Sequence, residues 1–186
     1  MNTSQNPSAI RSKKEITEAL LQLMEKYPYE EISVKQIVLE TDLVRKTFYR
    51  NFSSKDDVLR AYIDTVIQEY VDELIAHPED PLDVIFTFCE KKRNLFLLLD
   101  KNNMLYMLLL RLNEMLPEIR QTSDMSRNPF VRLFGELEPD YLIAFNVGAI
   151  WNVIFRWVRR GMLEPLVEVR NTLEKYLRRV ASDVAE

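Results

Sequence analysis

The sequence predicts an all-α protein. No segment shows sustained alternation of apolar and polar residues, whereas apolar residues recur at steps of three and four along most of the chain. The breaks between these periodic stretches carry prolines and helix-capping residues, and the 186 residues include only three glycines. We expect about nine or ten helices, divided between an N-terminal domain of residues 1–75 and a C-terminal domain of residues 76–186. The polar stretch from His77 to Pro81 separates the two domains.

Two helices are expected before residue 40. Apolar residues at helical spacing between Ile16 and Tyr27 indicate the first, which ends near Pro28. Ser33 opens the second, with Gln36 three residues further on. This spacing is typical of a capping box, in which each side chain accepts a hydrogen bond from the backbone N–H of the other residue.

A short helix fits residues 45–51, and a longer helix follows it. Serines at positions 53 and 54 cap the longer helix, and Asp56 and Asp57 lie near its positive N-terminal end. The apolar stripe of this helix extends to Leu74. The N-terminal domain therefore ends in a helix of about twenty residues.

The C-terminal domain continues the helical pattern. Asp80 caps a helix that Pro81 begins, and leucine-rich segments follow at residues 95–99 and 104–112. The helix that begins at Pro139 is apolar nearly all round and runs toward Gly161, a natural C-terminal cap. The last helix begins at Pro165.

Composition excludes several function classes. One cysteine and one histidine cannot form a disulfide framework or a structural zinc site, and the dispersed glycines cannot form a phosphate-binding loop. No convergent acid–base pair can be placed, so we expect neither an enzyme nor a cofactor. Residues 141–158 include two asparagines and Arg156, which favours a buried helix over a membrane span. The first fifteen residues are polar, so we expect no secretory leader and a cytoplasmic location.

The stretch from Ile32 to Leu59 has the features of a helix-turn-helix, because a short helix with cationic and hydroxyl side chains follows a capped helix. Between residues 33 and 55, five basic side chains face two acidic ones, a local balance of +3 in a chain of net charge −4. Phe48 and Phe52 lie four residues apart and can point inward, which leaves the polar side chains of residues 45–50 outward. Basic residues among the first fourteen could form an arm that contacts phosphates.

Residues 47–58, TFYRNFSSKDDV, resemble the Thr-Phe-Tyr-x-x-Phe-x-x-Lys-x-x-Leu run of TetR-family transcriptional regulators, with the leucine one position late at Leu59. The resemblance implies that Arg45 and Lys46 face base edges, while hydroxyl groups and lysines nearby contact phosphates. The DNA-binding residues that it implies are Ser33, Lys35, Arg45, Lys46, Thr47, Tyr49, Arg50 and Lys55.

The turn before the recognition helix departs from the family pattern. The family commonly has Ala-Gly-Val-Ser there, and this chain has Thr41-Asp42-Leu43-Val44. We expect Asp42 to take the left-handed conformation that glycine usually supplies. Val44 cannot cap the recognition helix as serine would, which costs about 1 kcal/mol unless a neighbour compensates.

The family resemblance also implies a C-terminal domain that binds a small-molecule effector and forms a homodimer. An apolar or aromatic effector suits the low charge of these helices, and the pocket is expected to include Phe86, Cys89, Phe96, Met104, Met107 and Trp151. The dimer interface is expected to include Phe145, Gly148, Ala149, Trp157, Leu173 and Tyr176. The arrangement of glycines and Trp157 here resembles the C-terminal region of TetR-like regulators of dihydroxyacetone kinase operons.

The predicted function is that of a sequence-specific transcriptional regulator, most simply a ligand-responsive repressor. Its predicted partners are double-stranded operator DNA, a second copy of the chain and an unidentified effector, with no membrane. The alternative is a helical protein-interaction module, for which DNA affinity would be weak and insensitive to sequence. A basic, aromatic-bearing helix alone fits either interpretation, and the ordered Thr-Phe-Tyr series favours the first.

Overall fold

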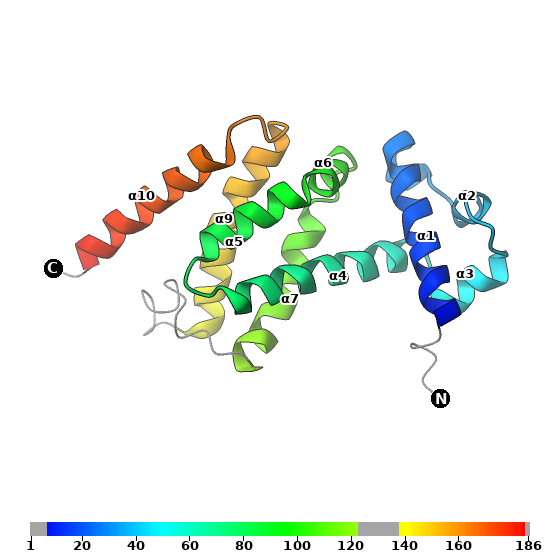
Figure 1. The fold of residues 1–186 in the computed structure, drawn as a ribbon, viewed down its shortest axis with the longest axis horizontal. Helices are drawn as coiled ribbons and strands as arrows, with labels where there is room; N and C mark the ends of the chain where they lie inside the picture. Colours follow the sequence, from blue (N-terminus) through cyan, green and yellow to red (C-terminus); the bar gives the residue numbers. More distant parts are fainter. Residues whose placement is uncertain (1–6, 123–137, 185–186) are drawn as a thin grey trace. The chain divides into compact units, whose positions relative to one another are not determined.

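In the computed structural model, residues 7–122 and 138–184 are described, and all of their regular secondary structure is helical (Figure 1). The chain divides into two compact units, one ending at Thr65 and the other beginning at Val66. The first unit contains α1 (Pro7–Lys26), the 3₁₀ helix η2 (Tyr29–Glu31), α2 (Val34–Leu39), α3 (Arg45–Asn51) and the start of α4 (Lys55–Ala76). The all-α prediction is confirmed for these residues.

The first unit is built around α1, against which both α2 and α3 pack. Its core side chains are at most 1% exposed: Ile16, Leu20, Ile37, Phe48, Val58 and Leu59. With six and seven residues, α2 and α3 are too short to be stable alone, because isolated helices in water need about 12–15 residues. Tertiary packing on α1 therefore holds the two short helices.

The division between the units lies inside α4, upstream of the His77–Pro81 seam. Val58 and Leu59 of α4 belong to the first unit, and the buried Val66 and Val71 belong to the second. A continuous helix shows no break in its apolar periodicity where it passes from one unit to the other. The sequence pattern for this reason cannot reveal such a boundary, and the limits 1–75 and 76–186 stay a prediction.

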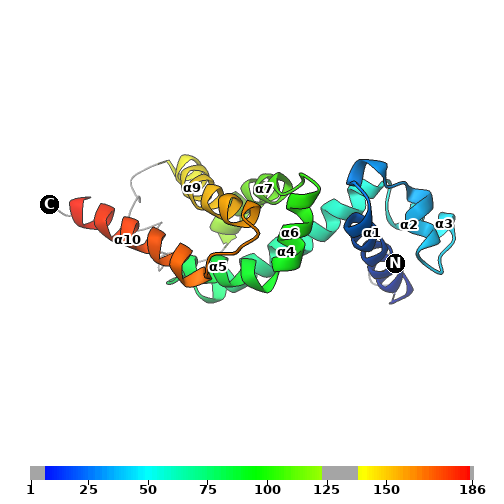
Figure 2. The ribbon, with the colours of Figure 1, turned by 90° about the horizontal axis from the view of Figure 1, so that it is seen from above.

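The second unit contains the rest of α4, followed by α5 (Pro81–Lys91), α6 (Arg93–Lys101), α7 (Tyr106–Thr122), α9 (Pro139–Arg159) and α10 (Leu166–Val184). Helix α9 packs against α6 and α7, while α10 packs on α5 (Figure 2). Fully buried side chains fill the space between them: Phe86, Phe96, Leu99 and Ile154. In both views the C-terminal part of α10 extends away from the other described helices of this unit.

The helix ends confirm most of the predicted caps. The carboxylate of Asp80 accepts a hydrogen bond from the backbone N–H of Asp83, 3.2 Å away, and Pro81 is the first residue of α5. Helix α9 begins at Pro139, as predicted. Helix α10 begins at Leu166, so Pro165 precedes the last helix instead of opening it.

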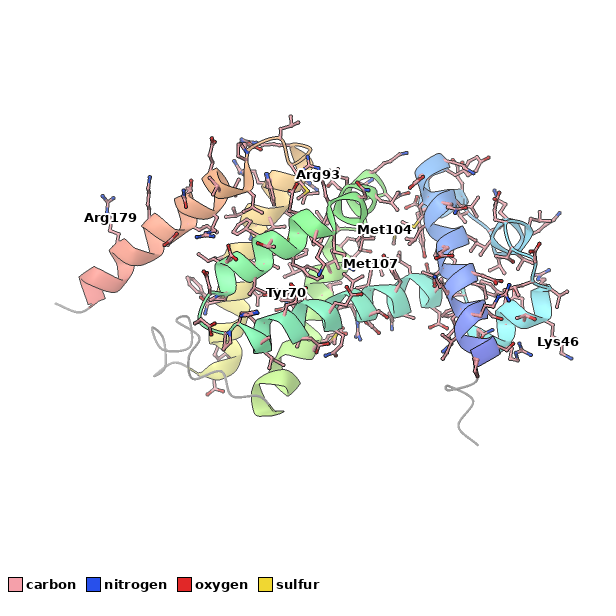
Figure 3. The ribbon with its side chains drawn as sticks, viewed as in Figure 1. Lys46, Tyr70, Arg93, Met104, Met107 and Arg179 are labelled. Atoms are coloured by element: carbon pink, nitrogen blue, oxygen red, sulfur yellow. The ribbon has the colours of Figure 1, made fainter. Side chains whose placement is uncertain are left out.

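Gly161 ends α9 in a left-handed conformation, with a φ of 74°. The N–H of Gly161 donates to Val158 O over 2.8 Å, and the N–H of Met162 donates to Trp157 O over 2.9 Å. These two bonds form a Schellman motif, which satisfies carbonyls that the helix end leaves free. Arg93 adds a second cap, since its Nη2 donates to the carbonyls of Gly161 and Met162 over 2.7 and 2.9 Å (Figure 3 labels Arg93).

In the described ranges, none of the helices combines the length and the apolar character that crossing a bilayer requires. The helix over residues 141–158 is instead half covered by its own unit. Its inner face carries Trp151, Ile154 and Trp157, each at most 4% exposed. Its outer face carries Tyr141 and Phe145, which are 77% and 64% exposed.

Replacing Gly161 should destabilise the chain through backbone strain. We expect Gly161→Ala to lower the free energy of unfolding by about 1 kcal/mol, because a residue with a Cβ resists the left-handed conformation. A Cβ there would lie 3.7 Å from Leu163 Cγ, an ordinary contact, so strain is the whole cost. The matched variant Gly161→Asn should lose less, since asparagine tolerates this conformation. Urea unfolding monitored by tryptophan fluorescence measures both, and equal losses would contradict the explanation.

Candidate nucleic-acid interface

The inner side of α3 is fixed by two aromatic rings. Phe48 is 0% exposed and Phe52 6%, and their ring centroids lie 6.2 Å apart. Lys46 and Arg50 are two positions either side of Phe48, so helix geometry places them on the opposite face, where both are exposed. Figure 3 shows Lys46 projecting away from the first unit. The side chains of Lys46 and Arg50 therefore point outward, as expected from the spacing of Phe48 and Phe52.

Arg45 and Tyr49 form a pre-arranged pair on the outer side of α3. The Arg45 guanidinium lies over the Tyr49 ring, 5.5 Å from its centroid, and its Nη2 donates to the Tyr49 hydroxyl over 3.2 Å. The Tyr49 ring, 48% exposed, meets the buried Phe48 ring edge-on at 5.4 Å. The pair thus packs against the core, and this packing restricts the side-chain rotamers of Arg45 before a ligand binds. A restricted arginine loses less rotamer entropy when it binds a base edge.

The turn between α2 and α3 closes without a left-handed residue. Among the described non-glycine residues, positive φ occurs at Asn103 and Met162, so the expectation for Asp42 is wrong. Thr41 closes the turn instead: its hydroxyl donates to Val38 O over 2.9 Å and accepts from the N–H of Leu43 over 3.3 Å. A hydroxyl at the end of a helix is the signal in the sequence that indicates this arrangement.

Ser33 and Lys35 lie at the start of α2. The predicted capping box is confirmed, because the Ser33 hydroxyl accepts from the N–H of Gln36 over 3.3 Å and the Gln36 side chain accepts from the N–H of Ser33 over 2.9 Å. The Ser33 hydroxyl also donates to Gln36 Oε1 over 2.7 Å. A phosphate contact by Ser33 would have to replace that bond. Lys35 is exposed.

Lys55 is anchored to the backbone of η2 and the residue after it. Its Nζ donates to the carbonyls of Tyr29, Glu30 and Ile32 over 2.6, 3.1 and 2.8 Å. An ammonium group has three N–H donors, so all of them are engaged, and Nζ also lies 4.5 Å from the centroid of the Tyr29 ring. A phosphate contact would require Lys55 to release at least one carbonyl.

A second bond strengthens the same junction, where the Tyr29 hydroxyl donates to Asp56 Oδ1 over 2.5 Å. We call Lys55, Tyr29 and Asp56 the η2 clamp, because together they tie η2 to the first turn of α4. Sequence reasoning missed the clamp, since its partners lie at least 23 residues apart and all three lysine bonds go to backbone carbonyls.

The basic residues near the N-terminus lie in α1, which begins at Pro7, so the expected arm is wrong for Arg11, Lys13 and Lys14. Arg11 Nε forms an ion pair with Glu15 Oε1 at 2.7 Å, and the hydrogen bond with this carboxylate raises the pKa of Arg11. Lys14 lies 3.7 Å from a carboxylate of Glu18. Helical spacing thus pairs two of these cations within α1.

The predicted effector-pocket residues occupy two environments. Phe86, Cys89 and Phe96 are at most 2% exposed and belong to the core of the second unit. Met104 and Met107, labelled in Figure 3, are half-buried just before and within α7. Trp151 lines a cavity beside α9. Burial raises the pKa of the Cys89 thiol, so this group is unreactive.

Five of the six predicted interface residues lie on free or half-covered faces of α9 and α10. Phe145 is 64% and Tyr176 63% exposed, and the others are exposed or half-buried: Gly148, Ala149 and Leu173. Trp157 differs, because it is 2% exposed, its ring lies 5.9 Å from that of Phe86, and its Nε1 donates to Glu164 O over 3.0 Å. Its side chain belongs to the core of its own subunit and is not available to a partner.

The geometry of the first unit, in which α1 carries a capped α2 and a short cationic α3, is that of a helix-turn-helix DNA-binding domain. The sequence model of "Bacterial regulatory proteins, tetR family" matches residues 16–62, from the middle of α1 to the first turns of α4. Residues 16–62 therefore form a TetR-type N-terminal helix-turn-helix domain, and this domain indicates a DNA-binding transcription regulator.

The fold of the whole chain resembles a solved structure described as the dihydroxyacetone kinase operon activator DhaS. The TM-score is 0.57 with 18% sequence identity, and the likeness covers 93% of this chain and 97% of that chain. At this identity the similarity concerns the fold alone. No curated protein matches the sequence.

Giving α3 a side-chain cap should stabilise the first unit. Val44 is the N-cap residue, with an extended backbone (φ −90°, ψ 152°), 67% exposure and no side-chain hydrogen bond. We expect Val44→Ser to raise the free energy of unfolding by about 1 kcal/mol over Val44→Ala, because only the serine hydroxyl accepts from a free N–H of the first turn. Urea unfolding of both variants measures the difference, and identical midpoints would show that α3 needs no cap.

Proposed function

We propose that the chain is a cytoplasmic, ligand-responsive repressor that binds its operator as a homodimer. The observation that carries the DNA-reading part is the outer face of α3, where Lys46, Tyr49 and Arg50 are exposed while Phe48 is completely buried. A short helix fixed on one side and cationic on the other fits the major groove of B-DNA. Bound at a promoter, such a protein excludes the polymerase from the same DNA.

In the proposed complex, α3 lies in the major groove and its N-terminal end reads bases. Arg45 and Lys46 contact base edges, where guanine offers two acceptors to a cationic side chain. Thr47 and Tyr49 donate hydroxyl hydrogens to phosphates on either side of the groove, and Arg50 adds a cation. Ser33 and Lys35 extend the phosphate contacts to the start of α2, whose N-terminal dipole also favours an anion.

The proposed dimer uses the outer faces of α9 and α10. Four large apolar side chains stand exposed there, between 55% and 77%: Tyr141, Phe145, Val167 and Tyr176. A second copy covers such a face and doubles the readout, because half-sites one helical turn apart lie about 34 Å from each other.

The effector response is proposed to be a population shift. A ligand held by the second unit favours a dimer in which the two copies of α3 no longer match successive major grooves. A ligand with equal affinity for both states shifts nothing, so the effector must prefer one of them by a few kcal/mol. The similar solved structure is named as an activator, and a promoter–reporter assay decides which direction holds for this chain.

Sequence-specific DNA binding tests the proposal, in a gel-shift series on DNA upstream of the chain's own gene at two salt concentrations. We expect Arg45→Ala to cost about 1–3 kcal/mol in specific binding and to relax the base preference. Lys101→Ala, an exposed lysine at the end of α6, is the matched control and should bind normally. Weak binding that is equal for upstream and unrelated DNA would instead support the protein-interaction module.

The hydrogen bonds of Lys55 give a prediction that distinguishes a structural role in the η2 clamp from a phosphate contact. We expect Lys55→Ala to lower the free energy of unfolding by about 1–3 kcal/mol, since three hydrogen bonds to a charged donor are lost. The slope of log K for DNA binding against log salt should stay as in the parent protein, with K calculated for the folded fraction of each preparation. A slope reduced by about one unit would instead show that Lys55 contacts a phosphate, as the sequence predicts.

Placing a charge on the proposed dimer face should separate the subunits. Phe145→Glu is expected to convert the dimer to monomer at micromolar concentration without unfolding α9, because the side chain is exposed and the helix tolerates glutamate. Leu39→Glu, 73% exposed on α2, is the matched control and should leave the mass unchanged. Sedimentation equilibrium reads both masses, and a dimer that persists in Phe145→Glu would place the interface elsewhere.

A further inference from the structure

A cavity of about 610 Å³ opens along the C-terminal half of α9, next to α7. Its lining includes the apolar side chains of Leu109, Trp151 and Phe155, and the rings of Trp151 and Phe155 meet edge-on at 5.5 Å. Its lining also includes Asn152 and three arginines: Arg156, Arg159 and Arg160. Its volume lies within the range of about 300–1,000 Å³ that small-molecule sites occupy.

Two hydrogen-bond donors of this cavity lack acceptors. Trp151 is 4% exposed, and its indole N–H is buried without a partner in the described part of the chain. Arg156 is exposed, and its guanidinium forms neither an ion pair nor a hydrogen bond with any described residue. Native proteins satisfy nearly all buried donors, so the unpaired indole N–H of a residue that lines the cavity indicates a missing acceptor.

The other two arginines are held at the rim by carboxylates. Arg159 Nε lies 3.6 Å from Asp100 Oδ1, with its guanidinium 5.8 Å from the centroid of the Phe155 ring. Arg160 Nη1 donates to Glu164 Oε1 over 2.8 Å, and this bond lowers the pKa of Glu164. Arg156 therefore differs from Arg159 and Arg160 in having no ion pair with a described residue.

We propose that this cavity binds an organic monoanion, a carboxylate attached to an aromatic or other flat apolar body. The body lies against Trp151 and Phe155, and the carboxylate accepts hydrogen bonds from the Arg156 guanidinium and from the indole N–H. A neutral apolar ligand leaves both donors unpaired, and a cation is repelled. This inference rests on the proposed effector response, and it names both the chemical class of the effector and a place for it.

The site differs from the pocket expected from the sequence. Of that set only Trp151 lines this cavity, whereas Phe86, Cys89 and Phe96 are packed in the core. The arginines were not singled out, because on a helix wheel they appear as an ordinary solvated end of α9. What distinguishes them is that α9 brings them beside an apolar wall that includes a residue of α7.

The test compares 2-naphthoate with 2-naphthamide, which has the same ring and no charge, by isothermal titration calorimetry at physiological salt. We expect the parent protein to bind the carboxylate at least tenfold more tightly than the amide. Arg156→Gln should remove this preference, and Arg156→Lys should keep part of it because the charge remains. Lys175→Gln, an exposed cation on α10, is the control and should retain the full preference.

Three results would overturn the inference: equal affinities for the two probes, no heat of binding at millimolar concentration, or a preference that survives in Arg156→Gln. Each variant is first checked for parental cooperative unfolding, so that a lost preference reports on the charge. Operator binding of the same preparations, measured without either probe, distinguishes failure of this inference from failure of the proposed function. Normal operator binding with no carboxylate preference would contradict this inference but would be consistent with the proposed function.

Discussion

Burial of the Phe48 ring is the constraint on which the proposed DNA-reading surface depends. Helix α3 has only seven residues, too few to persist unsupported, and its single completely buried side chain anchors it to the first unit. Once Phe48 points inward, the helical repeat of 100° per residue sets Lys46 and Arg50 outward. The Tyr49 ring rests on the edge of Phe48 and in turn supports Arg45. Packing therefore decides which polar groups face a ligand.

Polar contacts hold the segments of the first unit around α3. The η2 clamp joins the segment before α2 to the first turn of α4, and Thr41 closes the turn that leads into α3. Charge plays a different part, since the whole chain carries −4 while the segment around α3 is locally cationic. Attraction to DNA is then confined to one face, because fields from more distant carboxylates are screened beyond about 10 Å at 0.1 M salt.

Local rules predicted local structure well and failed where the partners were distant. The bounds of α3, the Ser33 capping box and the Gly161 cap follow from neighbouring residues and were predicted from the sequence. The carbonyl partners of Lys55 lie 23 to 26 residues away, and no pattern in the sequence pairs them. The same reason explains Trp157, whose spacing fits an exposed stripe although a ring from α5 covers it.

The most direct test of the DNA-reading surface is photocrosslinking from a single introduced cysteine. Cys89 can remain, because it is buried and its raised pKa keeps the thiol unreactive. A benzophenone attached at Lys46→Cys should crosslink to bases of the upstream DNA, and one at Asn171→Cys, exposed on α10, should not. Crosslinks to DNA from position 171 with none from position 46 would contradict the account.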